Sequence, residues 1–505
     1  MEQKDCYRHP FIHQVKLTTG QRIRGVILGS LLFPVRVTLA ALLFLVAWPL
    51  ARLRLAGLSE EERARPVTGW RRWLIHPIIL LLSRAVFFSL GFLWVKVKGR
   101  RADLKEAPVL VVAPHSGFLD MLILCETQLA TVVSRSENTS LPVIGALLEF
   151  NQAVLVSRKD PESRRKAVTQ LTERLTSDGY WPQMLIFPEG TTTNGQVLIK
   201  FKPGAFVPGV PVQPVLLRYP NRLDTVRWTY KGTSWVDVLW HTTSQFYTNM
   251  TVEFLPVYNP SEEEKNDPNL YADNVQKLMA GALRVPATDY VMQGGVPVNK
   301  LGGLSLPLES PARRTLSLLH RSSLEASAVE DALDRMIDRC RSGAPGSKVG
   351  AEELASILGL TDRETAVRVC KLYSKDESVD VGQFCLSVSA VSGFLSFKSL
   401  LHKAFSLFDR EGRGSLSAEE LSGLMGALLG FPQYNTAQLF KEASHQDEVT
   451  EENLLRVLTT HPTYQRVVNE YLQPVEAGSH LPFTPLPGGK TVNNNRDLHH
   501  NKKFE

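Results

Sequence analysis

The sequence has few cysteines and none of the spacings that bind metal ions or build a disulfide framework. The chain has 505 residues and five cysteines, which lie far apart. Their number is odd, and no Cys-x-x-Cys pair occurs. A zinc site and an extracellular disulfide scaffold are therefore not expected, whereas a reducing compartment is. No Gly-x-Ser-x-Gly motif occurs near a fitting triad, which argues against a serine hydrolase.

Residues 1–24 lack the pattern of a cleavable signal peptide because they are polar. The net charge is +6, and the positive residues are scattered without interleaved aromatic side chains. Nucleic acid is therefore not an expected partner. This mild positive charge suits an anionic membrane surface or substrates that carry phosphate.

Two long apolar stretches, at about 26–53 and at 73–97, predict attachment to membrane lipids. Each exceeds the roughly 20 residues that a membrane-crossing helix needs. Arg36 interrupts the first stretch, and His76 and Arg84 interrupt the second. Three arrangements stay open: a single span, a hairpin that re-enters the same face, and helices that lie in the interface. The second stretch also fits an amphipathic helix that covers a soluble domain.

The chain ends in "KKFE", which resembles the dilysine retrieval signal of endoplasmic reticulum membrane proteins. Coat proteins read that signal in the cytosol, so they are expected partners. No further apolar stretch of spanning length follows residue 97. We therefore expect an endoplasmic reticulum membrane protein with both domains facing the cytosol, with Golgi and lipid-droplet membranes as alternatives.

The order of apolar runs predicts an α/β domain with a mainly parallel sheet, followed by a helical domain. Buried strands are expected at 109–113, 153–157, 184–188, 212–219 and 251–258, and a helix at 162–176. Strands that alternate with helices favour a parallel sheet. The expected divisions are an N-terminal region with a membrane helix (1–70), an α/β domain with a membrane-associated helix (71–293), a linker (294–311), a helical domain (312–473) and a disordered tail (474–505).

The stretch "PHSGFLD" places His115 and Asp120 directly after an expected strand. On one continuous helix this separation would turn the two side chains about 140° apart. Pro114 favours a break at the end of the strand. If His115 lies in the turn and Asp120 in the first turn of the next helix, the carboxylate can orient the imidazole as a proton acceptor. The alternative is a histidine that only caps its own loop.

Two further stretches offer groups that bind phosphate or hydroxyl groups. "FPEGTTTNG" supplies Glu189, Gly190 and Thr191, and backbone amides in such a glycine turn can donate to phosphate oxygens. "AVLVSR" ends in Arg158, whose guanidinium can bind a phosphate through two parallel bonds. The alternatives are an ordinary loop and a surface arginine.

These stretches together with "VPVQP" resemble the glycerophospholipid acyltransferase family over about residues 70–290. The family pattern is His-x-x-x-x-Asp, a strand ending in Arg, Phe-Pro-Glu-Gly-Thr and Val-Pro-x-x-Pro. "SRKDPESRRK", "FKPGAF" and "PVQPVLLRYPN" resemble, more narrowly, lysophosphatidylcholine acyltransferases with EF-hand-like C-terminal regions.

The resemblance implies an acyl-CoA:lysophospholipid O-acyltransferase that needs no cofactor besides its co-substrate acyl-CoA. His115 would be the general base, Asp120 would orient it, and the lysolipid hydroxyl would attack the thioester directly. The substrate-binding residues would be Arg158, Glu189, Gly190 and Thr191.

The resemblance favours lysophosphatidylcholine as the acceptor. The alternatives are lysophosphatidylethanolamine, lysophosphatidylserine, lysophosphatidic acid and a lyso-ether lipid with acetyl-CoA. Members of the subgroup often have Cys where this chain has Thr192, and an Arg or polar pair at Gly195-Gln196, which puts head-group preference in doubt.

The helical region resembles EF hands, and a twelve-residue loop can be counted from Asp409. The candidate calcium ligands are Asp409, Glu411, Ser417 and Glu420. Gly414 stands at the required glycine position, but Arg413 places a cation where an oxygen ligand belongs. A structural helix pair is therefore the default, with calcium left open. A membrane-attached EF-hand adaptor without catalysis is the alternative class of function.

Overall fold

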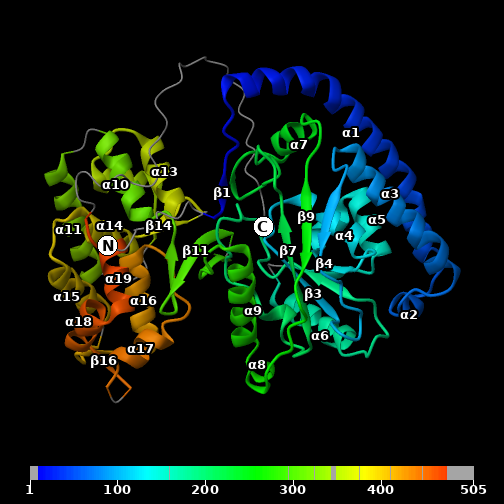
Figure 1. The fold of residues 1–505 in the computed structure, drawn as a ribbon. Coiled ribbons are helices and arrows are strands. Elements are labelled where there is room, and N and C mark those ends of the chain that lie inside the picture. The colour runs from blue at the N-terminus through cyan, green and yellow to red at the C-terminus, as the bar shows by residue number, and fades with distance from the viewer. Residues whose placement is uncertain are drawn as a thin grey trace. The chain divides into compact units, whose positions relative to one another are not determined.

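The computed structural model describes residues 10–157, 160–293, 295–322, 325–342, 348–374, 376–409, 411–445 and 447–474. The chain forms two compact units, whose boundary in the sequence lies between Thr288 and Asp289 (Figure 1). The predicted disordered tail with the dilysine lies outside the described residues beyond residue 474.

A seven-stranded, mainly parallel sheet forms the centre of the first unit, as the sequence predicted. Its spatial order is β2-β9-β7-β3-β6-β4-β5. The five strands from β7 to β5 run parallel, whereas β9 is antiparallel to β7 and parallel to β2. The strands are β2 (Val95–Lys98), β3 (Val109–Ala113), β4 (Thr131–Arg135), β5 (Val154–Val156), β6 (Met184–Ile186), β7 (Val212–Arg218) and β9 (Met250–Phe254).

Helices cover both faces of this sheet and close two apolar cores. On one face, α6 (Pro161–Leu175) and α9 (Pro268–Leu283) contribute Leu171 and Val275 to the core with β3 and β6. On the other face, Val86 and Val238 from two further helices pack against β3 and β7. The remaining helices of the unit are α1 (Thr19–Leu55), α2 (Glu60–Arg63), α3 (His76–Ser89), α4 (Ile123–Glu126), α5 (Pro142–Phe150), α7 (Trp235–Thr243) and α8 (Glu262–Asn266).

The second apolar stretch corrects one expectation. The predicted helix at 73–97 is a π-helical turn, Arg71–Ile75, followed by α3, which ends at Ser89. Gly91 has φ 104°, a backbone conformation that suits glycine, and Arg36 Nη1 lies 2.7 Å from where a Cβ would stand. The chain then turns into β2, whose alternating valines and lysines fit an edge strand.

Helix α1 contains the predicted membrane helix and packs along the first unit. It runs beside α3, α5 and α7 (Figure 1). The Arg36 guanidinium donates to the carbonyl oxygens of Thr243, Gln245 and Phe246 at 2.6–2.8 Å. The segments Thr19–Leu55 and Arg71–Ser89 are both long and apolar enough to cross a membrane. Arg36 therefore fastens α1 to the folded domain instead of only interrupting an apolar run.

The predicted linker at 294–311 is wrong for most of its length. It contributes to a three-stranded antiparallel sheet of β10 (Tyr290–Gln293), β11 (Val296–Leu301) and β12 (Leu304–Pro307). Gly302 and Gly303 form the β11–β12 turn with φ 57° and 81°. Val298 and Leu304 are fully buried, so apolar packing makes an ordered hairpin of a stretch whose Gly and Pro content suggested a linker.

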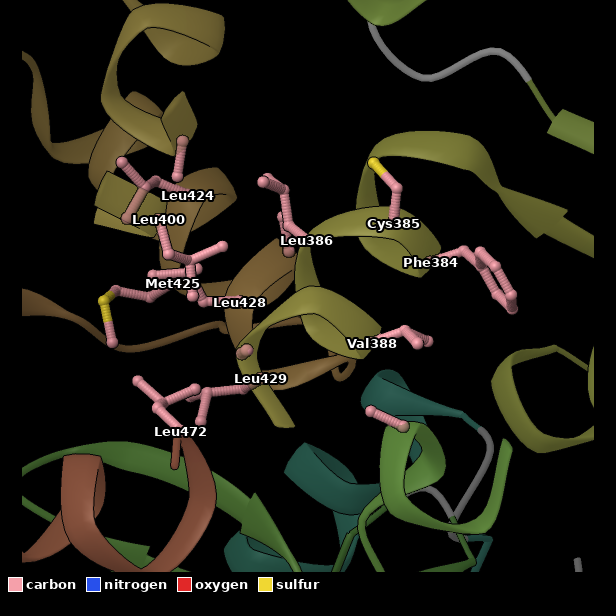
Figure 2. Close-up of a cluster of buried hydrophobic side chains, with 14 of the residues drawn as sticks. Phe384, Cys385, Leu386, Val388, Leu400, Leu424, Met425, Leu428, Leu429 and Leu472 are labelled. Carbon is pink, nitrogen blue, oxygen red and sulfur yellow. The ribbon is translucent and has the colours of Figure 1, made fainter. Parts of the chain in front are cut away.

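Ten helices and two short strand ladders make up the rest of the described second unit. In Figure 2, Leu386, Leu400 and Leu424 from three of these helices belong to one buried cluster. Two short ladders join loops between helices: β13 (Lys348–Gly350) with β14 (Ser378–Asp380), and β15 (Ser415–Leu416) with β16 (Val449–Thr450). The helices are α10 (Pro311–Arg321), α11 (Ala326–Ser342), α12 (Ala351–Leu358), α13 (Arg363–Tyr373), α14 (Val381–Ser392), α15 (Phe397–Phe408), α16 (Ala418–Leu429), α17 (Ala437–Ala443), α18 (Glu451–Thr460) and α19 (Pro462–Tyr471).

Candidate active site

His115 and Asp120 meet at the carboxyl end of β3. The strand ends at Ala113, and the chain turns into a short 3₁₀ helix, Phe118–Leu122, which carries Asp120. His115 Nδ1 lies 2.8 Å from Asp120 Oδ2. The contact that the sequence predicted is confirmed, and its reason is the break after β3, which lets residues five apart face each other.

The Asp120 carboxylate is buried and accepts hydrogen bonds on both oxygens. Besides His115, the backbone N–H groups of Ser116 and Gly117 donate to Oδ2 at 2.5 and 3.0 Å. The Tyr219 hydroxyl donates to Oδ1 at 2.5 Å. These four contacts fix the orientation of the carboxylate beside His115.

The imidazole of His115 is oriented so that its other nitrogen is available. Because a carboxylate only accepts, Nδ1 carries the proton in this contact, and Nε2 of the neutral ring is left as an acceptor. Nε2 has no hydrogen-bond partner among the residues that the structure describes, and the side chain is 19% exposed. Phe187 stacks on the ring, with centroids 4.2 Å apart. The arrangement can accept a proton from a hydroxyl group that enters the site.

Glu189 is buried behind His115, a position that the sequence did not predict. Its Oε1 accepts the His115 backbone N–H at 3.0 Å, and its Oε2 accepts the Thr193 hydroxyl at 3.1 Å. The Thr193 N–H in turn donates to the His115 carbonyl oxygen at 2.7 Å. Both Glu189 oxygens therefore hold the two loops together. Burial raises the pKa of Glu189 to about 8, against the opposing effect of these hydrogen bonds.

The other predicted substrate-binding residues are only partly placed. Gly190 adopts φ 64°, and a Cβ there would stand 2.8 Å from Lys202 Nζ, so a glycine permits this close approach. Thr191 is partly exposed beside it. Arg158 lies outside the described residues.

Sequence reasoning missed Tyr219 and Arg227. Tyr219 directly follows β7, the parallel neighbour of β3, which was the available signal. Burial, together with the nearby Asp120, raises the pKa of Tyr219 well above its usual value, so its hydroxyl stays a donor.

Arg227 carries a positive charge into the same region. Its Nε donates to Asp224 at 2.5 Å, while its buried Nη1 has no hydrogen-bond partner in the part of the chain that the structure describes. A Cβ on Gly195 would stand 2.2 Å from that Nη1. The Arg227 charge also acts to lower the pKa of both Glu189 and Tyr219. No local sequence pattern marks this arginine.

Comparisons with known proteins point to one family. Residues 95–218 match the family model described as "Acyltransferase". The chain is 44% identical over 483 residues to "Lysophospholipid acyltransferase LPCAT4" of Xenopus tropicalis, covering 94% of this chain and 91% of that protein. The chain belongs to the lysophospholipid acyltransferase family. It is an enzyme, and its family resemblance is confirmed.

This acyltransferase is also similar to a second curated relative and to a solved structure. It is 40% identical to human "Lysophosphatidylcholine acyltransferase 2" over 466 residues, covering 92% of this chain and 85% of that protein. The crystal structure of the 1-acyl-sn-glycerophosphate acyltransferase PlsC from Thermotoga maritima matches with a TM-score of 0.35 and 19% identity, covering 52% of this chain and 97% of that one.

The EF-hand-like loop of this acyltransferase is closed by its own side chains. Asp409 accepts the backbone N–H groups of Arg413 and Gly414 at 2.9 and 2.7 Å. The Arg413 guanidinium donates to both Glu420 oxygens at 2.9 and 3.2 Å and lies 3.3 Å from Glu411. Ser417 caps α16. These candidate ligands therefore do not fit a calcium ion as they stand, because a guanidinium pairs with Glu411 and Glu420 and backbone N–H groups occupy Asp409.

Proposed function

We propose that this acyltransferase moves the acyl group of acyl-CoA to the free hydroxyl of a lysophospholipid, and that its acceptor is lysophosphatidylcholine. One observation carries the chemistry: Asp120 holds His115 so that Nε2 is an available base in a partly exposed position. The printed names of the relatives support the acceptor. The reaction needs no cofactor besides the two substrates.

His115 acts as the general base. Its Nε2 takes the proton from the acceptor hydroxyl as the oxygen attacks the thioester carbon. The tetrahedral intermediate then expels the thiolate of CoA as the C–S bond breaks, and the imidazolium returns its proton to that sulfur. Asp120 stabilises the imidazolium, and Tyr219 holds Asp120 from the other side. No acyl-enzyme forms, because the hydroxyl attacks the thioester directly.

The substrate's polar groups are held by residues around the Gly190 turn. Gly190, Thr191 and Arg158 keep their predicted role as ligands. Glu189 differs, because both of its oxygens are bonded within the protein, and we assign it as a positioning residue. Arg227 adds a guanidinium with a buried Nη1, which suits a phosphate oxygen. Thr192 and Gly195 lie on this loop and bear on which head group is accepted.

The enzyme works on a membrane. The apolar helix α1 and the relatives indicate membrane association. We propose that α1 and α3 lie in the interface, because α1 is fastened to the domain through Arg36 while large apolar side chains such as Leu31, Leu42 and Trp48 are exposed. The endoplasmic reticulum location, the cytosolic side for both units and recognition of the dilysine by coat proteins complete the proposal.

Acyl transfer by membranes from expressing cells tests the proposal. Membranes with wild type and membranes with His115→Ala are each given labelled palmitoyl-, oleoyl-, arachidonoyl- or acetyl-CoA together with a panel of lysophospholipids. We expect the strongest transfer to lysophosphatidylcholine and a loss of roughly 10²-fold or more in the variant. Transfer to lysophosphatidylethanolamine, lysophosphatidylserine, lysophosphatidic acid or an ether lysolipid would replace the acceptor and keep the mechanism. An absence of His115-dependent transfer would sink the enzyme mechanism and favour the adaptor.

A further inference from the structure

A cavity lies at the amino ends of the parallel strands, on the opposite side of the sheet's long dimension from the catalytic residues. It has a volume of about 360 Å³. Residues 101–104, 127–131 and 182–183 line it, and these lead into β3, β4 and β6. These strands are parallel, so their amino ends lie at the opposite end of the sheet from His115 and Glu189, which follow the carboxyl ends of β3 and β6. The cavity, which we call the Arg54 pocket, is also lined by Arg54, Arg72, His76, Asn151 and Gln152.

The Arg54 guanidinium is buried there without a carboxylate partner. Arg54 is 4% exposed, and its Nε has no hydrogen-bond partner within the described residues. Its Nη1 lies 3.4 Å from His76 Nδ1, and the group stands over the Phe150 ring at 4.2 Å. His76 Nε2 lies 2.9 Å from the Gln128 carbonyl oxygen, so the imidazole is neutral when Nδ1 accepts from Arg54. A buried, unpaired charge is costly, and an anion would compensate it.

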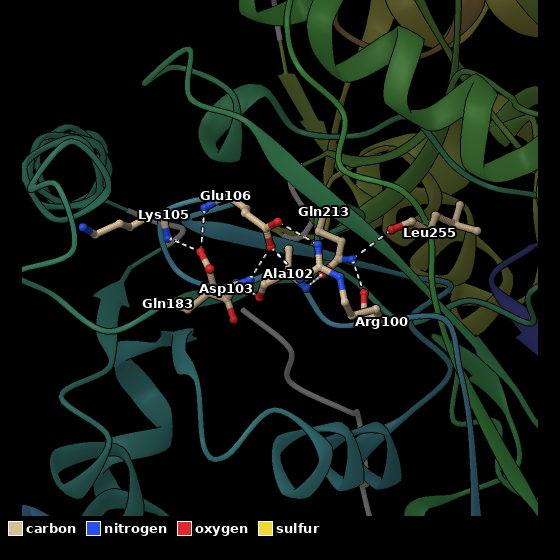
Figure 3. Close-up of polar contacts among 8 residues, drawn as sticks. All are labelled: Arg100, Ala102, Asp103, Lys105, Glu106, Gln183, Gln213 and Leu255. Carbon is tan, nitrogen blue, oxygen red and sulfur yellow. Dashed lines mark hydrogen bonds and ion pairs between the residues drawn. The ribbon is translucent and has the colours of Figure 1, made fainter.

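The other lining residues leave this positive charge largely unbalanced. Arg101 donates only to a neutral group, the Gln183 Oε1 atom, at 2.7 and 2.9 Å, and Arg72 forms no ion pair among the described residues. Asp103 is the acidic residue in the lining. Its Oδ1 accepts the backbone N–H groups of Lys105 and Glu106, so its hydrogen bonds serve its own loop (Figure 3).

Buried glutamines hold this loop in place. Gln183 Nε2 donates to the carbonyl oxygens of Ala102 and Ala107 at 3.2 and 2.7 Å. Gln213 Oε1 accepts the Ala102 N–H at 2.8 Å (Figure 3). The loop is therefore organised before any ligand enters, as in most small-molecule sites.

We propose that the Arg54 pocket binds a phosphate-bearing anion, the head group of an acidic membrane phospholipid. Arginine forks match phosphate oxygens in geometry and charge. A lipid is favoured over a soluble phosphate because the same helix ends expose Leu53, Trp70, Trp73 and Leu74. Tryptophan side chains of this kind belong at the level of lipid head groups. Binding would fix the α1–α3 corner at an anionic membrane.

Thermal unfolding of the purified full-length chain tests the site with soluble probes. Dihexanoyl phosphatidic acid, dihexanoyl phosphatidylcholine and inorganic phosphate are compared in wild type, Arg54→Met/Arg72→Gln, Arg22→Gln/Arg24→Gln and His115→Ala. A ligand that binds only the folded state raises Tm. We expect dihexanoyl phosphatidic acid to raise the Tm of every protein by several degrees except that of Arg54→Met/Arg72→Gln. Dihexanoyl phosphatidylcholine should change the Tm of wild type and of this variant equally.

The Arg22/Arg24 variant removes the same charge from the other end of α1, and His115→Ala reports on ligand bound at the catalytic site. An equal, Arg54-dependent rise with inorganic phosphate would make the ligand a soluble anion and overturn the lipid. No rise that depends on Arg54 and Arg72 with either anion would overturn the site.

Hydrogen exchange of the unmodified protein gives a second readout that does not depend on the folding of a variant. Phosphatidylcholine vesicles with roughly one part in four of phosphatidic acid are compared with phosphatidylcholine alone. Slower exchange at 101–107 and 128–131 with the acidic vesicles is expected. Equal exchange on both vesicles would contradict lipid binding in the Arg54 pocket.

Discussion

The loop that carries Asp120 and the loop that carries Asp409 share one local design but differ in the cation beside it. In each, two successive backbone N–H groups donate to an aspartate carboxylate. Beside Asp120 stands His115, whose neutral imidazole keeps one nitrogen as a proton acceptor. Beside Asp409 stands Arg413, which keeps its charge and binds Glu420. We infer that the basic side chain beside the carboxylate decides whether such a loop can take part in proton transfer.

Removal of the proposed base, His115, is the change with the largest expected effect. His115→Ala should lower kcat by roughly 10²–10⁴-fold, the usual contribution of a general base. Steady-state transfer to lysophosphatidylcholine measures it, and an unchanged Tm shows that the fold is intact. His402→Ala is the matched control, because His402 also contacts a carboxylate, Glu451, but lies in the second unit. Activity of the His115 variant within tenfold of wild type would contradict the comparison.

Tyr219→Phe tests how tightly Asp120 must be held. The hydroxyl bonded to a charged carboxylate contributes about 1.5–3 kcal/mol, which corresponds to roughly tenfold or more in rate if that positioning is used in catalysis. We expect kcat to fall and KM to change little. Tyr258→Phe is the control, because its hydroxyl donates to Glu264 in the same way at 2.6 Å. Equal losses in both variants would reduce Tyr219 to a structural residue.

Glu189 offers a third case, a buried carboxyl with no cation bonded to it. Its pKa is about 8 in the folded state against 4.5 for the ordinary group. Below pH 4.5 both states are protonated, and between pH 4.5 and about 8 the unfolded state loses its proton first. The free energy of unfolding therefore falls by up to about 1.4 kcal/mol for each unit that the pH rises in that window.

Glu189→Gln should remove this contribution, because an amide can still accept from His115 and does not titrate. The Tm of the variant should fall less than that of wild type as the pH rises through the window. Glu149→Gln, on a surface ion pair with Arg52, is the control and should follow wild type. Parallel curves for Glu189→Gln and wild type would contradict the buried, protonated carboxyl.

Arg413→Asp should have the smallest effect on stability. It replaces the cation of the Asp409 loop with a carboxylate, an oxygen ligand at the fifth loop position, so calcium should raise the Tm of the variant. Wild type and Arg413→Ala should show no calcium shift. Loss of the partly exposed pair with Glu420 alone should change the free energy of unfolding by about 1 kcal/mol or less. A calcium-dependent Tm in wild type would contradict the closed loop.

Features that depend on neighbouring residues were predictable from the sequence, whereas contacts between residues far apart in the chain were not. The parallel strands were predictable because each is a short apolar run, and the His115–Asp120 contact because both residues lie in one turn. Tyr219 lies 99 residues from its partner Asp120, and no local pattern signals such a contact. Glu189 was expected to face substrate, since burial cannot be read from a loop motif. The β11–β12 hairpin was mistaken for a linker because its glycines form a tight turn.

The hydrogen bonds from Arg36 to three carbonyl oxygens fix the orientation of the catalytic domain relative to helix α1. A catalytic domain on a loose tether would explore a volume of solution and would meet the bilayer at every angle. If α1 faces lipid as proposed, a domain fastened to it keeps one height and one tilt above the leaflet. Lysolipid and product would then exchange sideways within a plane, so the two-dimensional density of lysolipid, rather than its concentration in water, would govern the rate.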